Sequence, residues 1–149
     1  MQQNSVERPH IYNTMMSIVD TMARRSTCQR RGVGCVMADK YNHIVSTGHN
    51  GVPRGLPHCT DVGCGGVNFS KGEGLGVCDA VHAEQNALMF APNVMDITTC
   101  FVSISPCSHC TKMLLNTNIK IIVARDVYDI KACTMWREAG RELKKWVTG

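Results

Sequence analysis

The sequence predicts an α/β fold in which helices cover a mixed β-sheet. The second half of the chain alternates short apolar segments with helix-patterned segments, and strand–helix–strand units pair their strands in parallel through right-handed crossovers. The first half contains two apolar segments joined by a short polar stretch, which is typical of an antiparallel hairpin. A sheet that contains both kinds of pairing is mixed.

The first half is expected to hold a helix and the hairpin. Residues 12–24 are expected to be helical because their apolar side chains follow the i, i+3, i+4, i+7 spacing of an amphipathic helix. These side chains are Met15, Ile18, Val19 and Met22. The hairpin is expected to pair residues 33–38 with residues 44–47 around the polar turn at 39–43.

A long loop should follow the hairpin. Residues 48–78 contain nine glycines and two prolines and show no helical or strand period. A loop of this length is unusual in a compact domain unless it has a function or is held by a cross-link. Beyond it, the expected elements are a helix at 83–90, a strand at 100–104, a helix at 107–115, a strand at 120–124, a helix at 131–139 that stops near Gly140, and an edge strand at 143–147.

Length and composition favour one globular domain. The chain has 149 residues, of which 44% are hydrophobic, and can bury a continuous core. The domain is expected to span residues 1–149, with an ordered core at 12–147 and a cysteine-rich loop at 48–80. No apolar run approaches the roughly 18 residues that cross a bilayer, and the polar start lacks a secretory apolar core. We therefore expect a cytoplasmic protein without a membrane partner.

Charge and cysteine usage narrow the kind of ligand. The formal net charge is +4, a mild excess that suits an anionic small molecule. It falls short of the broad basic stripe of a dedicated nucleic-acid binder, so no nucleic-acid partner is expected. Nine cysteines are many for a chain of this length. In a reducing compartment such clusters more often bind metal than form disulfides.

Two short motifs supply a metal site and a carboxylate. His82, Cys107 and Cys110 give three ligands, whereas a structural zinc site closes its tetrahedron with four. Three ligands leave a position for water, which is typical of a catalytic site. Glu84 follows His82 by two residues and is suited to moving protons beside that water. Because all three ligands are expected at helix N-termini, the helix dipoles should favour thiolate over thiol.

The combined pattern is far more specific than either motif alone. His-x-Glu followed by Pro-Cys-x-x-Cys is the signature of zinc-dependent nucleobase deaminases. The alternative interpretation is a core histidine beside structural thiols.

The chain resembles the deoxycytidylate deaminases of the cytidine deaminase superfamily over about residues 12–142. Four segments carry the resemblance: Arg25-Ser26-Thr27-Cys28 with Val33-Gly34 after it, residues 46–55, residues 82–87 and residues 105–110. The first two separate this family from other zinc deaminases. The chain departs from the family at His49, where a tyrosine is usual, and at Cys35, which replaces a small apolar residue.

This resemblance implies a three-layer α/β/α sandwich around a five-stranded mixed sheet. It also implies zinc-dependent hydrolysis of dCMP to dUMP and ammonia, which feeds thymidylate synthesis. By the same analogy we expect a homo-oligomer, commonly a hexamer, with dCTP as an activator and dTTP with Mg²⁺ as an inhibitor.

Several residues are candidates for binding substrate. Asn50 matches the family's Asn-Gly and is expected to bind the sugar hydroxyl, although it could be a turn asparagine. Tyr128 matches a family tyrosine near the base and phosphate, although it could be an ordinary surface or core tyrosine. Backbone groups of Ala83 and Ser105 are expected to contact the pyrimidine edge. For the phosphate the sequence offers Arg25, Arg30 and Arg54, without a choice among them.

The glycine-rich loop suggests a second zinc site. Family members carry a second metal at positions that match Cys28, Cys59, Cys64 and Cys78, and four thiolates would close a structural tetrahedron. Free thiols, or a different set that includes His58, remain the alternatives. Cys35, Cys100 and Cys133 are expected to be buried thiols.

Other functions share the zinc signature. The same chemistry would suit a deaminase of nucleosides, of dCTP, or of bases in tRNA or single-stranded DNA. A non-enzymatic alternative is an inactive interaction module organised by zinc, against which the intact Glu84 argues.

Overall fold

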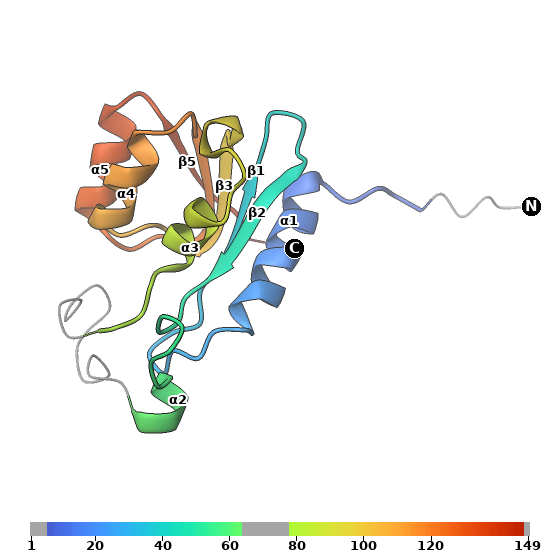
Figure 1. The fold of residues 1–149 in the computed structure, drawn as a ribbon. Helices are drawn as coiled ribbons and strands as arrows, with labels where there is room; N and C mark the ends of the chain where they lie inside the picture. The colour runs from blue at the N-terminus through green and yellow to red at the C-terminus, as the bar shows by residue number, and fades with distance from the viewer. Residues whose placement is uncertain (1–5, 64–77, 148–149) are drawn as a thin grey trace, which may run out of the picture.

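A computed structural model describes residues 6–63 and 78–147 (Figure 1). In chain order the helices are α1 (Ile11–Ala23), α2 (Cys59–Val62), α3 (Ala83–Met89), the 3-10 helix η2 (Val94–Asp96), α4 (Ser108–Leu115) and α5 (Ile130–Glu138). The strands are β1 (Gly34–Ala38), β2 (Ile44–His49), β3 (Thr99–Ile104), β4 (Ile121–Asp126) and β5 (Glu142–Lys145).

The five strands form one mixed sheet in the order β2-β1-β3-β4-β5. β1 pairs antiparallel with β2 and with β3, whereas β3 and β4 pair in parallel, as do β4 and β5. Cys35 lies opposite Val102 in the antiparallel pair, and Ile104 lies opposite Asp126 in the parallel one. The expected mixed sheet is confirmed, with the hairpin at one edge and the parallel strands at the other.

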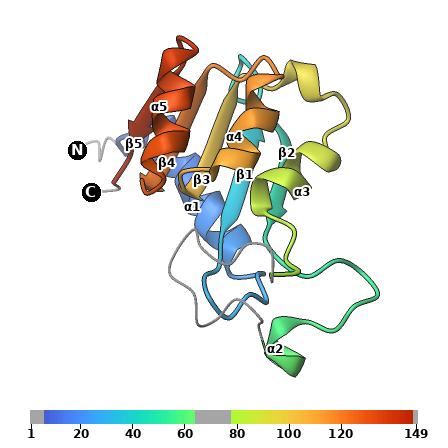
Figure 2. The ribbon, with the colours of Figure 1, turned by 90° about the vertical axis from the view of Figure 1, so that its left-hand side faces the viewer.

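Helices cover both faces of the sheet and make three layers. α1 lies on one face, and α3, α4 and α5 lie on the other (Figures 1 and 2). Every residue of β1 is buried because this strand is central and covered on both sides. The predicted α/β/α sandwich around a five-stranded sheet is therefore confirmed.

Alternating strand residues divide the core into two clusters. Val36, Phe101 and Val123 face α1, where they pack against Met16 and Val19. The neighbouring positions on the same strands face the other helices; they are Cys35, Met37, Cys100, Val102, Ile122 and Ala124, packed with Ala83, Ala87, Leu114 and Trp136. The period of two along each strand thus fills both interfaces.

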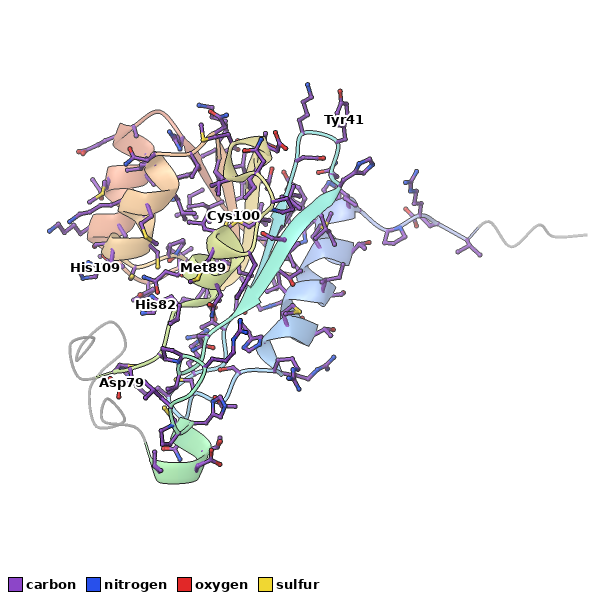
Figure 3. The ribbon with its side chains drawn as sticks, viewed as in Figure 1. Tyr41, Asp79, His82, Met89, Cys100 and His109 are labelled. Carbon is purple, nitrogen blue, oxygen red and sulfur yellow. The ribbon has the colours of Figure 1, made fainter. Side chains whose placement is uncertain are left out.

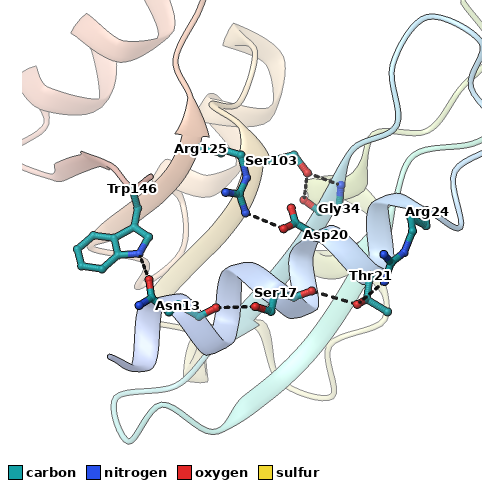
Figure 4. A network of polar contacts seen from close by, with 9 residues as sticks. All are labelled: Asn13, Ser17, Asp20, Thr21, Arg24, Gly34, Ser103, Arg125 and Trp146. Atoms are coloured by element: carbon teal, nitrogen blue, oxygen red, sulfur yellow. Dashed lines mark hydrogen bonds and ion pairs between the residues drawn. The ribbon is translucent and has the colours of Figure 1, made fainter. Parts of the chain in front are cut away.

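Polar contacts fix α1 against the sheet (Figure 4). Asp20 pairs with Arg125 at 2.8 Å, and Asn13 accepts a hydrogen bond from the Trp146 indole at 2.8 Å. On β3, the Ser103 hydroxyl accepts from the Gly34 N–H at 2.9 Å. The contacts of Asp20 and Asn13 link α1 to β4 and to the segment after β5, which lie far away in the sequence, whereas the contact of Ser103 joins β3 to β1.

Arg141 closes the C-terminal end of α4. Its guanidinium donates to the carbonyl oxygens of Leu114, Leu115 and Ile119 at 3.1, 2.7 and 2.7 Å. The last carbonyls of a helix have no partner within the helix, and a cation near them is favourable. Arg141 therefore fixes the far end of the helix whose first turn carries Cys110.

α3 approaches β2 closely because Gly48 has no side chain. A Cβ at this position would collide with the Ala83 carbonyl oxygen and would lie 2.7 Å from the Ala87 nitrogen. Ser46, two residues earlier on the same face, donates to the Ala87 carbonyl oxygen at 2.7 Å. The glycine thus sets the height of α3 above the sheet, and with it the position of the residues that open the helix.

Each helix and strand expected from the sequence is present, and its ends differ from the expected ones by one or two residues at most. The helix α2 inside the expected loop and the 3-10 helix η2 were missed, since a single turn is too short to show a period. No helix in the described parts of the chain is long and apolar enough to cross a membrane.

Candidate active site

The candidate site lies at one end of the strands. The parallel strands β3 and β4 end there, and β1 begins and β2 ends on the same side because they run antiparallel to each other. Figure 3 shows His82 and His109, which mark the starts of α3 and α4, at the end of the molecule opposite Tyr41 in the β1–β2 turn. Functional side chains of α/β proteins commonly gather at the carboxyl ends of the strands.

Three metal-ligating side chains converge at this end of the strands. The Nδ1 atom of His82 lies 3.6 Å from the Cys107 sulfur and 3.3 Å from the Cys110 sulfur. One ligand atom from each residue lies within 4.8 Å of the others, close enough to share one ion. The structure thus brings together the three residues that the sequence predicted as ligands.

Helix starts place these ligands. His82 is the N-cap of α3, where its N–H donates to the Gln85 side-chain oxygen at 2.8 Å. Cys107 is the N-cap of α4, and Cys110 lies in the first turn of that helix, facing inward. Two helix N-termini therefore point their partial positive charge at the two sulfurs, which stabilises thiolates.

The electrostatics of the two thiols fit a cation. The contact with Cys110 and the hydrogen bond with His82 lower the pKa of Cys107 to about 4, against the opposing effect of burial. The contact with Cys107 and burial raise the pKa of Cys110. A dication at this position would be held by the sulfurs of Cys107 and Cys110 and by the imidazole of His82. This sulfur and nitrogen donor set suits Zn²⁺.

Glu84 lies beside the ligand cluster but is not part of it. Its side chain is 4% exposed, in the first turn of α3. Burial raises the pKa of Glu84, and a hydrogen bond from the Cys110 thiol partly offsets this effect. Burial that disfavours the charged form suits a carboxyl group to donating a proton as well as accepting one. The carboxylate predicted to be catalytic therefore has the environment of an acid/base group.

Ser105 and Tyr128 come from the two loops that follow β3 and β4. Ser105 is 2% exposed, and its hydroxyl accepts from the Tyr128 N–H at 3.0 Å. Burial raises the pKa of Tyr128, and the negative charges of Cys107 and Glu84 add to the effect. Because Ser105 lies two residues before Cys107, the hydrogen bond between Ser105 and Tyr128 places the Tyr128 backbone beside the candidate site. Ala83 is fully buried as the first residue of α3.

Asn50 braces the loop before β1. Its side-chain oxygen accepts from the Val33 N–H at 2.8 Å, and its amide nitrogen donates to the Arg31 carbonyl oxygen at 2.8 Å. Asn50 is 8% exposed and directly follows β2, at the end of the strands where the site lies. The side chain thus has a clear role in holding the loop, and its contact with a sugar stays a prediction.

The arginines predicted for the phosphate lie in two loops. Arg25 and Arg54 are exposed and Arg30 is half-buried. Arg31 was not predicted from the sequence; its guanidinium pairs with Asp126 at the end of β4 at 2.7 Å. The side-by-side arginines at 30 and 31 were the available signal, but the partner is far away in the sequence.

The second metal site is only partly within the described residues. Cys59 is buried at the start of α2, and Cys28 and Cys78 are half-buried. The Thr27 hydroxyl lies 3.0 Å from the His58 Nδ1 atom, which brings the segments carrying Cys28 and Cys59 together. Cys64 lies outside the described residues, so the four-cysteine site stays a prediction.

Asp129, which was also not predicted from the sequence, contacts two helices. One of its carboxylate oxygens accepts from the N–H and the hydroxyl of Ser108, at 3.2 and 3.0 Å. The other accepts from the Ala132 N–H at 3.0 Å, as the N-cap of α5. An aspartate before a helix was the available signal, but it indicates a cap and not a contact with a second helix.

Comparison with known proteins agrees with this site. Residues 9–125 match the family model described as the cytidine and deoxycytidylate deaminase zinc-binding region. The deoxycytidylate deaminase of Schizosaccharomyces pombe is 32% identical over 94% of this chain, although the chain spans about half of that relative, 45% of its length. The deoxycytidylate deaminase of Mycobacterium phage D29 is 31% identical, over 79% of this chain and 96% of its own.

A solved structure shares the fold. The dCMP deaminase of cyanophage S-TIM5, in complex with dCMP and dUMP, has a TM-score of 0.72 and 25% sequence identity, and the match covers 94% of this chain and 99% of that one. Three observations agree: the metal ligands converge at the end of the strands, the family model matches, and the phage relative is similar over most of its length. The chain belongs to the family of cytidine and deoxycytidylate deaminases that carry this zinc-binding region.

Proposed function

We propose that this protein hydrolyses dCMP to dUMP and ammonia with a zinc ion held by His82, Cys107 and Cys110. The observation that carries the proposal is the buried Glu84 beside three converging ligands. The names of the yeast and phage relatives, and the dCMP and dUMP in the cyanophage structure, support dCMP as the substrate. The product would supply thymidylate synthesis in the cytoplasm.

Glu84 carries the proton transfers of the proposed reaction. A zinc ion bound by the three ligands supplies Lewis-acid activation of water at neutral pH. Glu84 accepts a proton from the attacking water and delivers it to N3 of cytosine, which makes C4 more electrophilic. Glu84 then takes the second proton from the hydroxyl group now bound to C4 and passes it to the departing amine, so that ammonia leaves as the C4 carbonyl forms. Because burial favours its neutral form, the protonated state needed for these deliveries is accessible.

Backbone groups at the site can hold the cytosine ring. The Ser105 N–H already donates to the Asp126 carbonyl oxygen at 2.8 Å, so the contact with cytosine falls to the Ser105 carbonyl oxygen. This oxygen can accept from the cytosine amino group. The Ala83 N–H opens α3, where the first N–H groups of a helix have no carbonyl partner within it, and it can donate to the ring carbonyl. Tyr128 lies in the loop after β4, next to Ser105, and would line the substrate site from that side.

A substrate panel tests the proposal. Purified protein is incubated with dCMP, dCTP, deoxycytidine, adenosine-containing tRNA or single-stranded DNA, and the exchange of amine for carbonyl is followed by mass spectrometry. We expect dCMP to be converted fastest. Faster conversion of another compound would replace dCMP by that substrate, and the absence of conversion in zinc-loaded protein would favour an inactive zinc-organised module.

Cys28, Cys59, Cys64 and Cys78 are proposed to bind a second, structural zinc. We expect two zinc ions per chain in fully active protein. Cys59→Ser should reduce this to about one and lower the unfolding temperature, because a structural zinc contributes folding free energy. Cys133→Ser is the matched control, since it changes a buried thiol of α5 outside the set. One zinc per chain in fresh, fully active protein would refute the second site.

Assembly and regulation are proposed by analogy with the family. The protein would form a homo-oligomer, and the exposed apolar side chains of Met89 and Phe90, at 63% and 59%, are compatible with an intersubunit contact. A dCTP activator and a dTTP inhibitor with Mg²⁺ are proposed on the same basis.

A further inference from the structure

The two loops that follow β3 and β4 are fastened together beside the candidate metal site. The Ser105 N–H donates to the Asp126 carbonyl oxygen at 2.8 Å, and the Tyr128 N–H donates to the Ser105 hydroxyl at 3.0 Å. The third connection is the pair of hydrogen bonds from Ser108 to Asp129. These loops carry Cys107 on one side and Tyr128 on the other, so these hydrogen bonds fix the position of Cys107 relative to Tyr128.

Asp129 does more than an ordinary helix cap. One oxygen caps α5 through the Ala132 N–H, and the other holds the N–H and the hydroxyl of Ser108, the first residue of α4. The carboxylate therefore joins the N-termini of two helices. Cys107 directly precedes Ser108, and Cys110 lies one helical turn away, so the orientation of this turn determines where both sulfurs point.

Loss of the carboxylate would release the turn that carries the sulfurs. The Ser108 N–H is one of the first N–H groups of α4, which have no carbonyl partner within the helix. Without Asp129 this N–H would donate to water instead, and the first turn of α4 would be free to shift. Zinc binds in a tetrahedral arrangement that depends on ligand placement, and removal of groups that orient ligands typically weakens binding by about 10- to 100-fold.

We propose that Asp129 is a positioning residue that holds the first turn of α4, which begins at Ser108, and with it Cys107 and Cys110, in the geometry that binds zinc. It touches neither the metal ligands' donor atoms nor the reacting atoms. Tyr128, its neighbour in the chain, is held separately by the hydrogen bond from its N–H to the Ser105 hydroxyl. This inference rests on the zinc site of the proposed function, but zinc affinity tests it without any substrate.

A role in stability alone is the competing explanation, and Asp39 offers a matched control. Asp39 accepts backbone N–H groups of Tyr41 and His43 at 2.8 and 3.0 Å. It is therefore also an aspartate that accepts two backbone hydrogen bonds. Its turn lies at the opposite end of the molecule from His82, as the position of Tyr41 in Figure 3 shows. Asp39→Ala should lower stability without reaching the metal site.

The experiment measures the zinc dissociation constants of the full chain by competition with a chromogenic chelator, and the constant of the site at His82, Cys107 and Cys110 is identified as the one that Cys59→Ser leaves unchanged. Wild type, Asp129→Ala, Ser108→Ala and Asp39→Ala are compared at a temperature where each is folded. We expect Asp129→Ala to raise the constant about 10- to 100-fold. Ser108→Ala removes only the hydroxyl contact and should raise it less, and Asp39→Ala should leave it within about twofold of wild type.

Each outcome decides the role of Asp129. Weaker zinc binding in Asp129→Ala with unchanged binding in Asp39→Ala supports positioning. An equal loss of unfolding temperature in both variants with unchanged zinc affinity would show that Asp129 only caps α5. If Asp129→Ala does not fold, Ser108→Ala decides, because an unchanged dissociation constant in that variant would also refute the proposal. A wild-type chain that binds no zinc would overturn the metal site and this inference together.

Discussion

Glu84→Gln is expected to retain zinc and fold while losing turnover of dCMP by about 10²- to 10⁴-fold, the usual cost of removing a positioned acid/base group. Glutamine keeps the shape of the side chain but cannot accept a proton from water or pass one to N3 of cytosine. The measurement is kcat under saturating dCMP, together with zinc content by elemental analysis. His82, Cys107 and Cys110 are unchanged in this variant, so the stoichiometry of the catalytic metal should not fall.

Loss of stability can be separated from loss of chemistry in this variant. Burial of Glu84 opposes its charged form, so a neutral side chain of the same size should leave the unfolding temperature unchanged or slightly higher. Glu138→Gln, at an exposed position of α5, is the matched control and should keep full activity. If zinc content dropped with Glu84→Gln, the residue would be a ligand rather than a proton carrier.

Short-range sequence patterns were sufficient to predict the helices and strands of the fold and the three metal ligands. Cys107 and Cys110 are three residues apart at the start of α4, a spacing that places two side chains on one face of a helix. His82 and Glu84 belong to one short motif at the start of α3. The mixed sheet followed similarly from hairpin and crossover rules that depend on neighbouring segments. Convergence of the two motifs then needed only the family signature.

Contacts between distant segments could not be predicted in this way. Arg31 and Asp126 are 95 positions apart in the chain, and Ser108 and Asp129 are 21 apart. Neither pair belongs to a periodic pattern, because the contacts depend on how the loops pack at the end of the strands. The same limit applies to Asn50, whose Asn-Gly motif indicates a turn but not the brace to Val33.

The second large effect is expected in a comparison of substrates. Deoxycytidine should be processed with a kcat/KM at least about 10²-fold below that of dCMP, because binding energy from the remote phosphate helps to position the reacting base. The two compounds differ only in the phosphate, so the ratio isolates its contribution. Cytosine contacts at Ala83 and Ser105 would be the same for both. Equal kcat/KM for the two compounds would contradict the monophosphate proposal and favour a nucleoside deaminase.

Single alanine variants of Arg25, Arg30, Arg54 and Arg31 should identify the phosphate ligand. Arginine binds phosphate through paired N–H groups, so replacement of the true ligand should lower kcat/KM for dCMP far more than for deoxycytidine. An arginine that only supports the loop should impair both substrates alike, and Arg31 tests this because its guanidinium is held by Asp126. Arg137→Ala, at an exposed position of α5, controls for net charge and should change neither value. If no single variant alters the ratio, the phosphate is bound by groups other than these arginines, and the backbone N–H groups of the loop after β2 become the next candidates.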